Sequence, residues 1–365
     1  MMEPYAVFPK RISHHAVAEQ LAASSLAYPA IQSKVREIVG GPRPEGGDRV
    51  GYIHHPFCEK LCTFCSFFRV LKDEDALSRF LHVLCERLKR CGDSSYMSAH
   101  PFDAFYFGGG TPTTMRPDQM SRLMETLRSS LTFADDLEFT SESTFANITP
   151  EMLAVLKAGG VNRMSLGVQT FSPRLRKLIG RQCHPDEVLQ KIALVRRFME
   201  VVNLDLVYNF PTQTVAEWEK DLLTAIATGV ETLSIHPLVP VNDSPLSGLI
   251  RSGAVEEMGD EKRQYEFYTA VLDILQPCVS FNRVNTFQWY NSRVYRIEEE
   301  EGYDASDRMS AFQKAQEWGE RIPIGVLYRS ARPTREEQEP VIATCSLVKQ
   351  PLEATSFSKL LEAFR

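Results

Sequence analysis

The sequence predicts an α/β protein built as a partial or complete barrel of parallel strands. Between residues 50 and 275, short apolar runs alternate six times with longer amphipathic stretches, which is typical of parallel strands joined by right-handed helical crossovers. The Gly-x-Gly-x-x-Gly pattern of doubly wound dinucleotide-binding sheets does not follow the first run. Special polar residues gather at the C-terminal ends of the runs, the face where α/β barrels carry their active sites.

The elements are expected in a regular order. The predicted strands are Val50–His54, Ala104–Phe107, Leu137–Ser141, Arg163–Val168, Val202–Tyr208 and Thr232–His236. The predicted helices are Glu74–Lys89, Pro117–Leu131, a helix opened by Thr149-Pro150-Glu151 and closed by Gly159-Gly160, Pro185–Met199, Thr214–Thr228 and Asp260–Leu275. Proline is favourable at a helix start because its missing N–H would be unsatisfied there anyway.

Three regions are expected along the chain. Residues 1–48 are predicted to be an N-terminal helical extension, 49–240 the core barrel, and 241–365 a C-terminal helical region on the substrate side. The extension ends at Gly40-Gly41-Pro42, a strong break signal. Residues 303–365 are interrupted by four prolines and are interpreted either as a substrate lid or as an altered tail.

Composition restricts the classes of partner. Of the 365 residues, 43% are hydrophobic and 24% charged, and the net charge of −6 gives no electrostatic reason to bind nucleic acid or an anionic membrane. No apolar run approaches the length of a membrane span. Glu19 and Gln20 interrupt the only signal-like stretch, and eight cysteines without a signal indicate a reducing compartment. We therefore expect a cytoplasmic monomer that acts on a small molecule.

Three cysteines lie within eight residues after the first predicted strand. Cys58, Cys62 and Cys65 have the spacing C-x3-C-x2-C. Cysteine thiolates hold iron–sulfur clusters, normally four per cluster. With three, one iron keeps an open position, and an open position marks a reactive metal site rather than a structural one.

Zinc binding and disulfide formation are the alternative interpretations of these thiols. A zinc site could use them with His54 or His55, but the second distant cysteine pair of most zinc loops is missing. Disulfides are disfavoured by the odd number and close spacing. The remaining cysteines, each interpreted as a small buried hydrophobe, are Cys85, Cys91, Cys183, Cys278 and Cys345.

Further candidates follow the next strands. The glycines 108–110 allow a ligand to approach the backbone closely, and their N–H groups could meet a carboxylate or phosphate. Glu142 could bind an ammonium group or ribose hydroxyls, with an ion pair to Arg163 as the alternative. Asp205 lies among apolar strand residues, where a carboxylate is costly unless it has partners, and ribose hydroxyls would suit.

The string from Tyr52 to Phe67, YIHHPFCEKLCTFCSF, resembles the radical S-adenosylmethionine (SAM) superfamily. It is most similar to the oxygen-independent coproporphyrinogen III oxidase-like branch, which also includes haem chaperones and two-SAM radical C-methyltransferases. The resemblance extends over roughly residues 49–292. It implies a partial (β/α)6 barrel of TIM type, with a [4Fe–4S] cluster on Cys58, Cys62 and Cys65.

The same resemblance implies contacts to one or two SAM molecules. It is carried by the segments GGGTPT, NRMSLGVQ and NLDLVY. The residues implied for the first SAM are Tyr52, Gly109 and Glu142, of which Tyr52 and Glu142 are also the expected catalytic residues. The residues implied for the second SAM are Phe64, Gly110, Thr111, Gln169, Arg181 and Asp205, with a backbone contact near Val239. Asn209-Phe210-Pro211 stands in place of the family's Gly-Leu-Pro, which leaves the geometry of that turn open.

The implied reaction begins with reductive cleavage of SAM at the cluster to a 5′-deoxyadenosyl radical, with electrons from a donor such as flavodoxin or ferredoxin. Coproporphyrinogen oxidases of the branch carry a fourth cysteine where this chain has Phe67, and the chaperones carry a histidine where it has Val284. Both departures favour radical C-methyl or methylene transfer to an sp2 carbon of a conjugated substrate, porphyrin-like or a natural product. Oxidative decarboxylation of a coproporphyrinogen, a haem chaperone and a structural zinc protein remain as alternatives.

Overall fold

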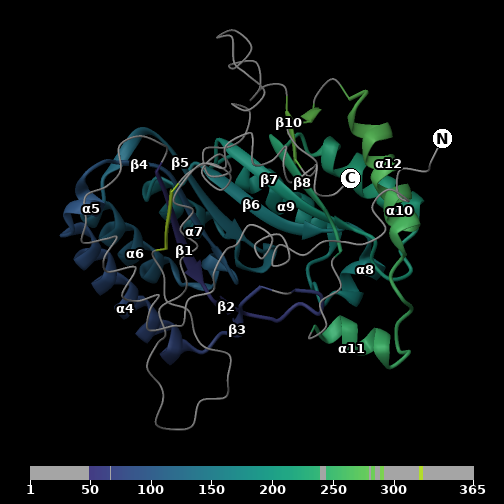
Figure 1. The fold of residues 1–365 in the computed structure, drawn as a ribbon, viewed down its shortest axis with the longest axis horizontal. Coiled ribbons are helices and arrows are strands. Elements are labelled where there is room, and N and C mark those ends of the chain that lie inside the picture. Colours follow the sequence, from purple (N-terminus) through teal and green to yellow (C-terminus); the bar gives the residue numbers. More distant parts are fainter. Residues whose placement is uncertain are drawn as a thin grey trace, which may run out of the picture.

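The computed structural model describes residues 49–65, 67–238 and 244–278, together with strands at 281–283, 288–291 and 320–323. Its centre is a sheet of six parallel strands that alternate with helices along the chain (Figure 1). These strands are β1 (Arg49–His55), β4 (Phe102–Gly109), β5 (Phe133–Ser143), β6 (Arg163–Gln169), β7 (Val201–Tyr208) and β8 (Thr232–Pro237). Strands consecutive in this series are neighbours in the sheet. The predicted α/β fold with a parallel, partial barrel is confirmed.

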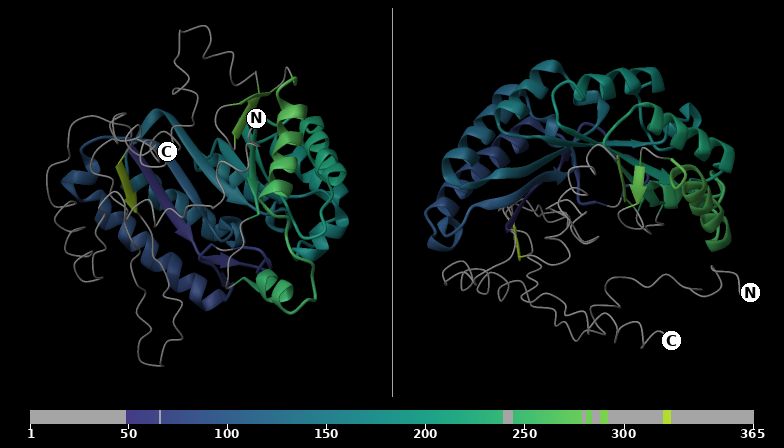
Figure 2. Two further views of the ribbon diagram at one scale, coloured as in Figure 1. Left: turned by 45° about the vertical axis from the view of Figure 1, so that its right-hand side comes forward. Right: turned by 90° about the horizontal axis from the view of Figure 1, so that it is seen from above.

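Helices cover the convex side of this curved sheet, as the view from above in Figure 2 shows. The helices are α4 (Glu74–Gly92), α5 (Ser95–Ser98), α6 (Pro117–Ser130), α7 (Pro150–Ala158), α8 (Pro173–Leu178), α9 (Pro185–Val195), α10 (Val215–Ala227), α11 (Pro245–Arg251) and α12 (Glu261–Leu275). Two 3₁₀ turns, η1 (Pro112–Thr114) and η2 (Phe145–Asn147), follow β4 and β5. In the part of the chain that is described, no helix combines the length and apolarity needed to cross a bilayer.

All six predicted strands exist, but several extend further than expected. β5 continues through Ser143, because Glu142 and Ser143 still pair with Ser165 and Leu166 of β6. Glu142 and His236 therefore lie within strands rather than after them, and Gln169 is the last residue of β6. The apolar run in the sequence ends earlier than the hydrogen-bonded ladder, which is why the prediction was short.

Further strands extend the sheet beyond the six predicted. β10 (Gln288–Asn291) pairs antiparallel with β8, β9 (Phe281–Arg283) pairs with β10, and β11 (Glu320–Pro323) lies parallel to β1. The sequence did not predict these strands, which come from the expected C-terminal region. The expected helical extension 1–48 and the segments 292–319 and 324–365 lie outside the described residues.

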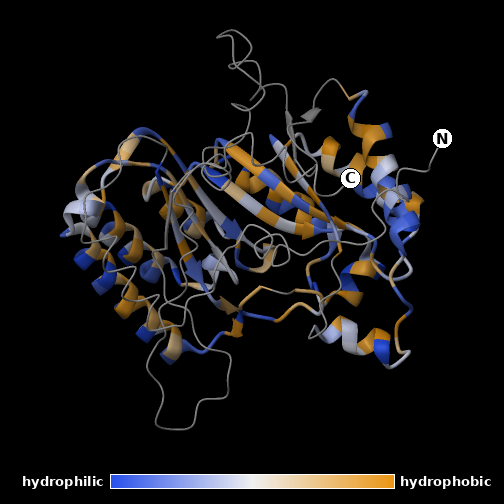
Figure 3. Ribbon diagram, viewed as in Figure 1, coloured by the Kyte–Doolittle hydropathy of each residue, from blue (hydrophilic) through white to orange (hydrophobic). Residues whose placement is uncertain are grey.

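Local sequence explains where the helices begin. The Thr149 hydroxyl accepts from the Met152 N–H at 3.2 Å, and Pro150 occupies the first turn of α7. Thr214 and Glu217 form a capping box at the start of α10. Hydrophilic and hydrophobic residues alternate around the helices, so each places an apolar stripe on the sheet (Figure 3).

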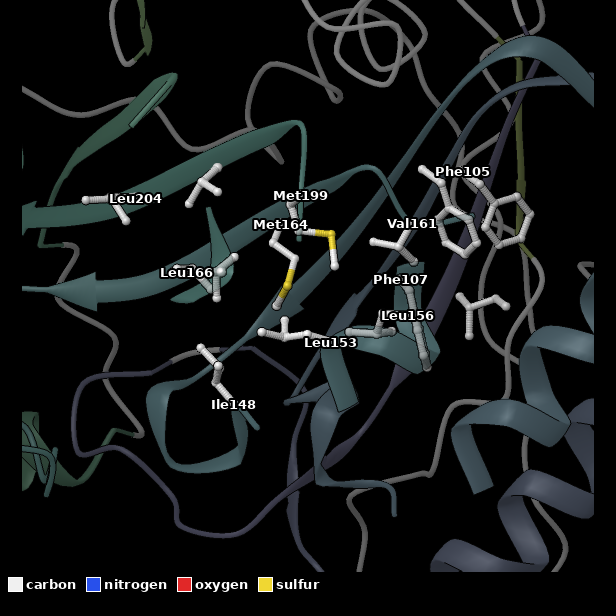
Figure 4. Packing of buried hydrophobic residues seen from close by; sticks show 14 of the residues in the cluster. Phe105, Phe107, Ile148, Leu153, Leu156, Val161, Met164, Leu166, Met199 and Leu204 are labelled. Carbon is white, nitrogen blue, oxygen red and sulfur yellow. The ribbon is translucent and has the colours of Figure 1, made fainter. Parts of the chain in front are cut away.

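The main core lies between the sheet and its helices. Figure 4 shows Leu153 and Leu156 of α7 gathered with Phe107 of β4 and Met164 of β6, and all four are buried. Replacing either leucine by alanine would cost about 2–5 kcal/mol, as for other buried leucines. With its convex face filled in this way, the sheet presents polar residues on the opposite, concave face.

Candidate active site

A cavity of about 200 Å³ opens at the C-terminal ends of the parallel strands. The predicted site residues that line it are Cys58, Cys62, Phe64, Cys65, Gly109, Gly110, Thr111, Glu142, Gln169, Arg181 and Asp205. They come from the loop after β1 and from the ends of β4, β5, β6 and β7, with Arg181 following α8. Residues far apart in the sequence, such as Cys58 and Asp205, thus line one space.

The cysteine loop is tied at its base and at its tip. Two short strands, β2 (Phe57–Cys58) and β3 (Val70–Leu71), close the base, where the Lys72 N–H donates to the Cys58 carbonyl at 2.8 Å. At the tip, the Thr63 N–H donates to the Ile179 carbonyl at 3.3 Å, and the Thr63 carbonyl accepts from the Leu246 N–H at 2.9 Å. The loop therefore owes its shape to segments that lie far along the chain.

The three thiols are free of disulfides; Cys58 is buried, and Cys62 and Cys65 are half-buried. Burial raises the pKa of Cys58 and Cys65, and the charge of Arg69 opposes that rise at both. The Thr111 hydroxyl lies 3.6 Å from the Cys58 sulfur. Across the described residues, no three His, Cys, Asp or Glu side chains are close enough to share one metal ion. Cysteines that hold a cluster bind different irons, so they do not need to meet at a single point.

The glycines after β4 let two segments touch. A Cβ at Gly109 would lie 2.7 Å from the His55 carbonyl oxygen, and one at Gly110 would lie 2.7 Å from that of Phe57. Gly109 also has φ +115°, which side-chain-bearing residues rarely adopt. The Gly110 and Thr111 N–H groups donate to the carbonyls of His55 and Phe57 at 2.6 and 2.9 Å. The end of β4 is thereby bonded to the chain that enters the cysteine loop.

Glu142 projects from β5 and is held by β4. Its two carboxylate oxygens accept from the Tyr106 hydroxyl at 2.8 Å and from the Gly109 N–H at 3.0 Å. Burial, and then the charge of Asp205, raise the pKa of Glu142 to about 7, while both donors and Arg163 oppose the rise. Arg163, the alternative partner from the sequence, acts here as a nearby charge.

Asp205 is the second carboxylate of the cavity. It accepts from the Ser165 hydroxyl at 3.0 Å and from the Asn203 amide at 2.7 Å. The Asn203 oxygen in turn accepts from Thr232 and Ser234 at 2.8 and 3.1 Å. Burial raises the pKa of Asp205, and these donors limit the rise. The carboxylate thus has the partners that its place in an apolar strand requires.

Gln169 and Arg181 meet over Gly167. The pairing of β6 with β7 shifts between Gly167 and Gln169, and Gln169 takes φ +67°. A Cβ at Gly167 would lie 3.0 Å from the Gln169 amide nitrogen and 3.2 Å from an Arg181 nitrogen. Within the described part of the molecule, the buried Nε of Arg181 has no hydrogen-bond partner. The Arg181 side chain therefore lines this corner of the cavity with one buried N–H left unsatisfied.

A buried hydrogen-bond network centred on Asp221 and Arg176 holds the segment between Gln169 and Arg181. The sequence did not predict this network. Asp221 of α10 accepts from the Thr170 hydroxyl at 2.6 Å and the Phe171 N–H at 2.7 Å. Burial raises the pKa of Asp221 to about 6, and its two donors oppose the rise. Arg176 donates to the carbonyls of Val168, Thr170 and Cys183 at 2.9–3.1 Å, which brings Cys183 to the cavity wall. No motif or spacing in the sequence indicates a role for Arg176 or Cys183.

Among the described residues, one predicted site residue, Tyr52, does not line the cavity. Tyr52 stacks on Tyr106 with ring centroids 6.0 Å apart, and its hydroxyl lies 3.2 Å from His54 Nδ1. Burial raises the pKa of Tyr52 well above its usual range. Val239 lies outside the described residues. The role of either residue toward SAM stays a prediction.

The histidines that a zinc site would require are engaged elsewhere. His54 Nε2 lies 2.9 Å from the Phe68 carbonyl oxygen, and its Nδ1 faces Tyr52. His55 Nε2 lies 2.8 Å from the Thr114 hydroxyl, and burial lowers its pKa to about 3. Both ring nitrogens of His54 thus have partners, which weakens its candidacy as a zinc ligand, whereas the buried Nδ1 of His55 has no hydrogen-bond partner among the described residues.

The structure defines the geometry of the turn after β7, which the sequence left open. Asn209, in the place of the family's glycine, has φ +69°, and its amide donates to the Gly259 carbonyl at 3.0 Å. Asparagine enters the left-handed region more readily than most residues. The substitution therefore keeps the glycine-type conformation of the turn.

Comparison with known families agrees with this geometry. The model of the radical SAM superfamily matches residues 52–225, which span β1 to α10. Residues 52–225 are a radical SAM domain. A second family model, which describes the C-terminal part of the pyruvate ferredoxin oxidoreductase beta chain, matches residues 278–344.

The proteins similar to this chain include an anaerobilin synthase, a heme chaperone and a coproporphyrinogen III oxidase. Anaerobilin synthase of Escherichia coli O157:H7 is 32% identical over 56% of this chain and 46% of its own length. The heme chaperone HemW of Bacillus subtilis (strain 168) is 29% identical over 62% of this chain and 59% of its own. The chain thus spans about half the length of the curated relatives it matches. The solved structure of coproporphyrinogen III oxidase (HemN) from Escherichia coli, a radical SAM enzyme, has a TM-score of 0.64 at 21% identity over 74% of this chain and 61% of its own.

The radical SAM superfamily implies SAM and a [4Fe–4S] cluster, and the residues present fit both. Three thiols unpaired in disulfides, a glycine-lined approach and two carboxylates face one cavity. Arg181, whose buried Nε has no hydrogen-bond partner among the described residues, also lines this cavity. These groups suit a thiolate-bound cluster beside a ligand with ammonium, carboxylate and ribose groups.

Proposed function

We propose that this chain is a radical SAM enzyme of the coproporphyrinogen oxidase-like branch that uses two SAM molecules to transfer a methyl-derived carbon to an sp2 carbon of a conjugated substrate. The observation that supports it best is the convergence of the three motif cysteines with Glu142, Gln169, Arg181 and Asp205 on one cavity. A family motif can occur by chance in one segment, but chance is a poor explanation for five separate segments whose matching residues line one cavity.

In this proposal the chain's residues bind, orient and exclude water. Cys58, Cys62 and Cys65 would hold the cluster, which when bound supplies the electron and the open iron for SAM cleavage. Glu142 is already oriented by Tyr106 and Gly109, so it would meet an ammonium group without reorganisation. Asp205, fixed by Ser165 and Asn203, would accept from ribose hydroxyls.

The choice of methyl transfer depends on departures from the family pattern. Phe67 takes the place of the fourth cysteine of coproporphyrinogen oxidases, and it lines the cavity together with Phe64 and Phe145. These rings suit a flat, conjugated substrate. The curated relatives are named for haem, coproporphyrinogen and anaerobilin, which supports a tetrapyrrole-like substrate.

The test is a product assay after anaerobic reconstitution. With dithionite, SAM and a haem or porphyrin substrate, we expect 5′-deoxyadenosine and S-adenosylhomocysteine to appear together. SAM deuterated in its methyl group should label the product. Formation of 5′-deoxyadenosine without S-adenosylhomocysteine would reject methyl transfer and favour coproporphyrinogen-type oxidation. Flavodoxin or ferredoxin in place of dithionite would test the expected electron donor.

A haem chaperone is the second candidate function, and the 29% identity to the Bacillus subtilis heme chaperone HemW favours it. Val284 replaces the histidine that the chaperones carry, so we expect weak or no specific haem ligation. Titration with haem, followed by the Soret band, separates the two. A saturable shift at one haem per chain, without SAM turnover, would select the chaperone.

A further inference from the structure

Arg69 follows the cysteine motif, and its side chain joins two points of the cysteine loop by hydrogen bonds. Its guanidinium donates to the Cys62 carbonyl at 3.0 Å and to the Phe67 carbonyl at 3.1 Å, on either side of Cys65. Arg69 also lines the cavity that contains the three thiols. One side chain thus bridges two points of the loop and presents its charge to the space between the thiols.

One buried donor of this side chain is unused. The Nε of Arg69 is buried and has no hydrogen-bond partner among the described residues. A buried unpaired donor is costly, and a functional role or a bound water or ion is the kind of explanation it calls for. Arg181, which has an unpartnered Nε too, approaches the same cavity from the opposite segment of the chain.

Charge next to an iron–sulfur cluster changes its redox behaviour. The reduction potential of a cluster depends on its net charge and on hydrogen bonds near its sulfurs. Reduction adds one electron from the donor and forms no bond, so the reduced cluster carries one more negative charge. A fixed cation beside it stabilises the reduced form more than the oxidised form, which raises the potential. Arginine keeps its charge at any pH relevant to the protein.

We infer that Arg69 is a positioning residue with two effects: it fixes the cysteine loop through the Cys62 and Phe67 carbonyls, and its charge raises the reduction potential of the cluster. The inference rests on the proposed function, since it requires that the loop holds a cluster. It adds a residue of this chain that no part of the cysteine motif specifies.

The experiment compares three variants with the wild type, all reconstituted anaerobically and without SAM. Arg69→Gln removes the charge and the fork of donors. Arg69→Lys keeps the charge but cannot bridge two carbonyls in the same way. Lys72→Gln is the matched control: it removes a cation from the same loop whose charge is already offset by Glu59 and Glu74 at 3.1 and 2.9 Å. Midpoint potential by redox titration with EPR and iron per chain are the readouts.

We expect Arg69→Gln to lower the midpoint potential and the iron retained per chain. Arg69→Lys should keep a potential near that of the wild type but retain less iron, and Lys72→Gln should match the wild type in both. If Arg69→Gln holds too little iron to titrate, a potential in Arg69→Lys clearly below that of the wild type overturns the inference, because that variant keeps the charge. A potential in Arg69→Gln equal to that of the wild type, or a fall in Arg69→Lys as large as in Arg69→Gln, would overturn the inference. A wild type that takes up no cluster would instead refute the proposed function itself.

Discussion

Two walls of the same cavity are built in different ways. The cysteine wall is a loop whose shape depends on a few bonds: Lys72 and Arg69 close the loop on itself, and Thr63 joins it to segments far along the chain. The opposite wall consists of strand residues: Glu142 is held by two donors from the neighbouring strand β4, and Asp205 by Ser165 of β6 and Asn203 of its own strand. The loop wall can be disrupted by single changes, whereas the strand wall has redundant support. The following changes test that contrast.

The largest effect is expected from Cys65→Ala. A loop with two thiols cannot hold a cluster that already has one open iron, so iron after reconstitution should fall from about four per chain to near zero. Reductive cleavage of SAM should disappear with it.

Cys183→Ser is the control for this change. Cys183 lines the same cavity but lies outside the motif, so its variant should retain the cluster. Equal iron loss in both variants would show that the motif does not define the cluster site.

Gly109→Ala should be the next most damaging change. It forces a side chain into φ +115° and against the His55 carbonyl at 2.7 Å, and it disturbs the N–H that binds Glu142. Backbone strain alone costs about 1–3 kcal/mol. Thermal or urea unfolding measures the loss.

Gly253→Ala separates strain from collision. Gly253 has φ +73°, but a Cβ there would meet nothing within 4 Å. We expect this control to lose clearly less stability than Gly109→Ala; an equal loss would mean that the contact with His55 is unimportant.

Glu142 predicts a pH dependence. Its folded pKa of about 7 exceeds the ordinary value of 4.5, so the folded state holds the proton more tightly than the unfolded state. The stability of the ligand-free protein should therefore decrease as pH rises from about 4.5 to 7. SAM binding should strengthen over the upper part of that window, because an ammonium group requires the ionised carboxylate.

Glu142→Gln checks both parts of this pH prediction. The variant should flatten the change in melting temperature between pH 4.5 and about 7, the interval between the ordinary and the raised pKa of Glu142. It should also weaken SAM binding and remove its pH dependence, as measured by calorimetry. An unchanged pH profile would exclude Glu142 as the group responsible.

Ser165→Ala should have the smallest effect. It removes one hydrogen bond to Asp205, but the Asn203 amide still donates at 2.7 Å. A single hydrogen bond contributes about 0.5–1.5 kcal/mol, so SAM affinity should fall less than about tenfold. Asn203→Ala, which also strands Thr232 and Ser234, should lose more; the reverse order would contradict the redundancy of this wall.

The contrast between the two walls also explains what the sequence could predict. The strand wall was readable because apolar runs mark strands, and the residues at their ends share one edge of a parallel sheet. The C-terminal ends of the six predicted strands therefore agree with the structure within one or two positions, whereas β5 begins at Phe133, earlier than the predicted Leu137. Glu142, Gln169 and Asp205 lie on these strands and line the cavity, and their roles toward SAM stay predictions. The cysteine wall was indicated by a different signal, the spacing of the three thiols.

What could not be predicted depends on contacts between distant segments. Tyr106 reads as an ordinary strand aromatic, and only the absence of a side chain at Gly108 lets it reach Glu142. Tyr52 has the family's identity but stacks behind Tyr106 instead of lining the cavity. Helix α8 has six residues, which is too few to show a helical period. The hydrogen-bond network of Arg176 and Asp221 next to it therefore has no recognisable sequence pattern.

Thr63, at the tip of the cysteine loop, is bonded to Ile179 and to Leu246, which follow it by more than a hundred residues. During synthesis on the ribosome the three thiols emerge early, yet the second of these partners is made only after β8. Such long-range pairings form late in folding, because their loop-closure entropy has to be overcome first. The proposed cluster pocket is therefore finished among the last parts of the nascent barrel, and we expect a cluster to be loaded into the completed chain rather than into its growing end.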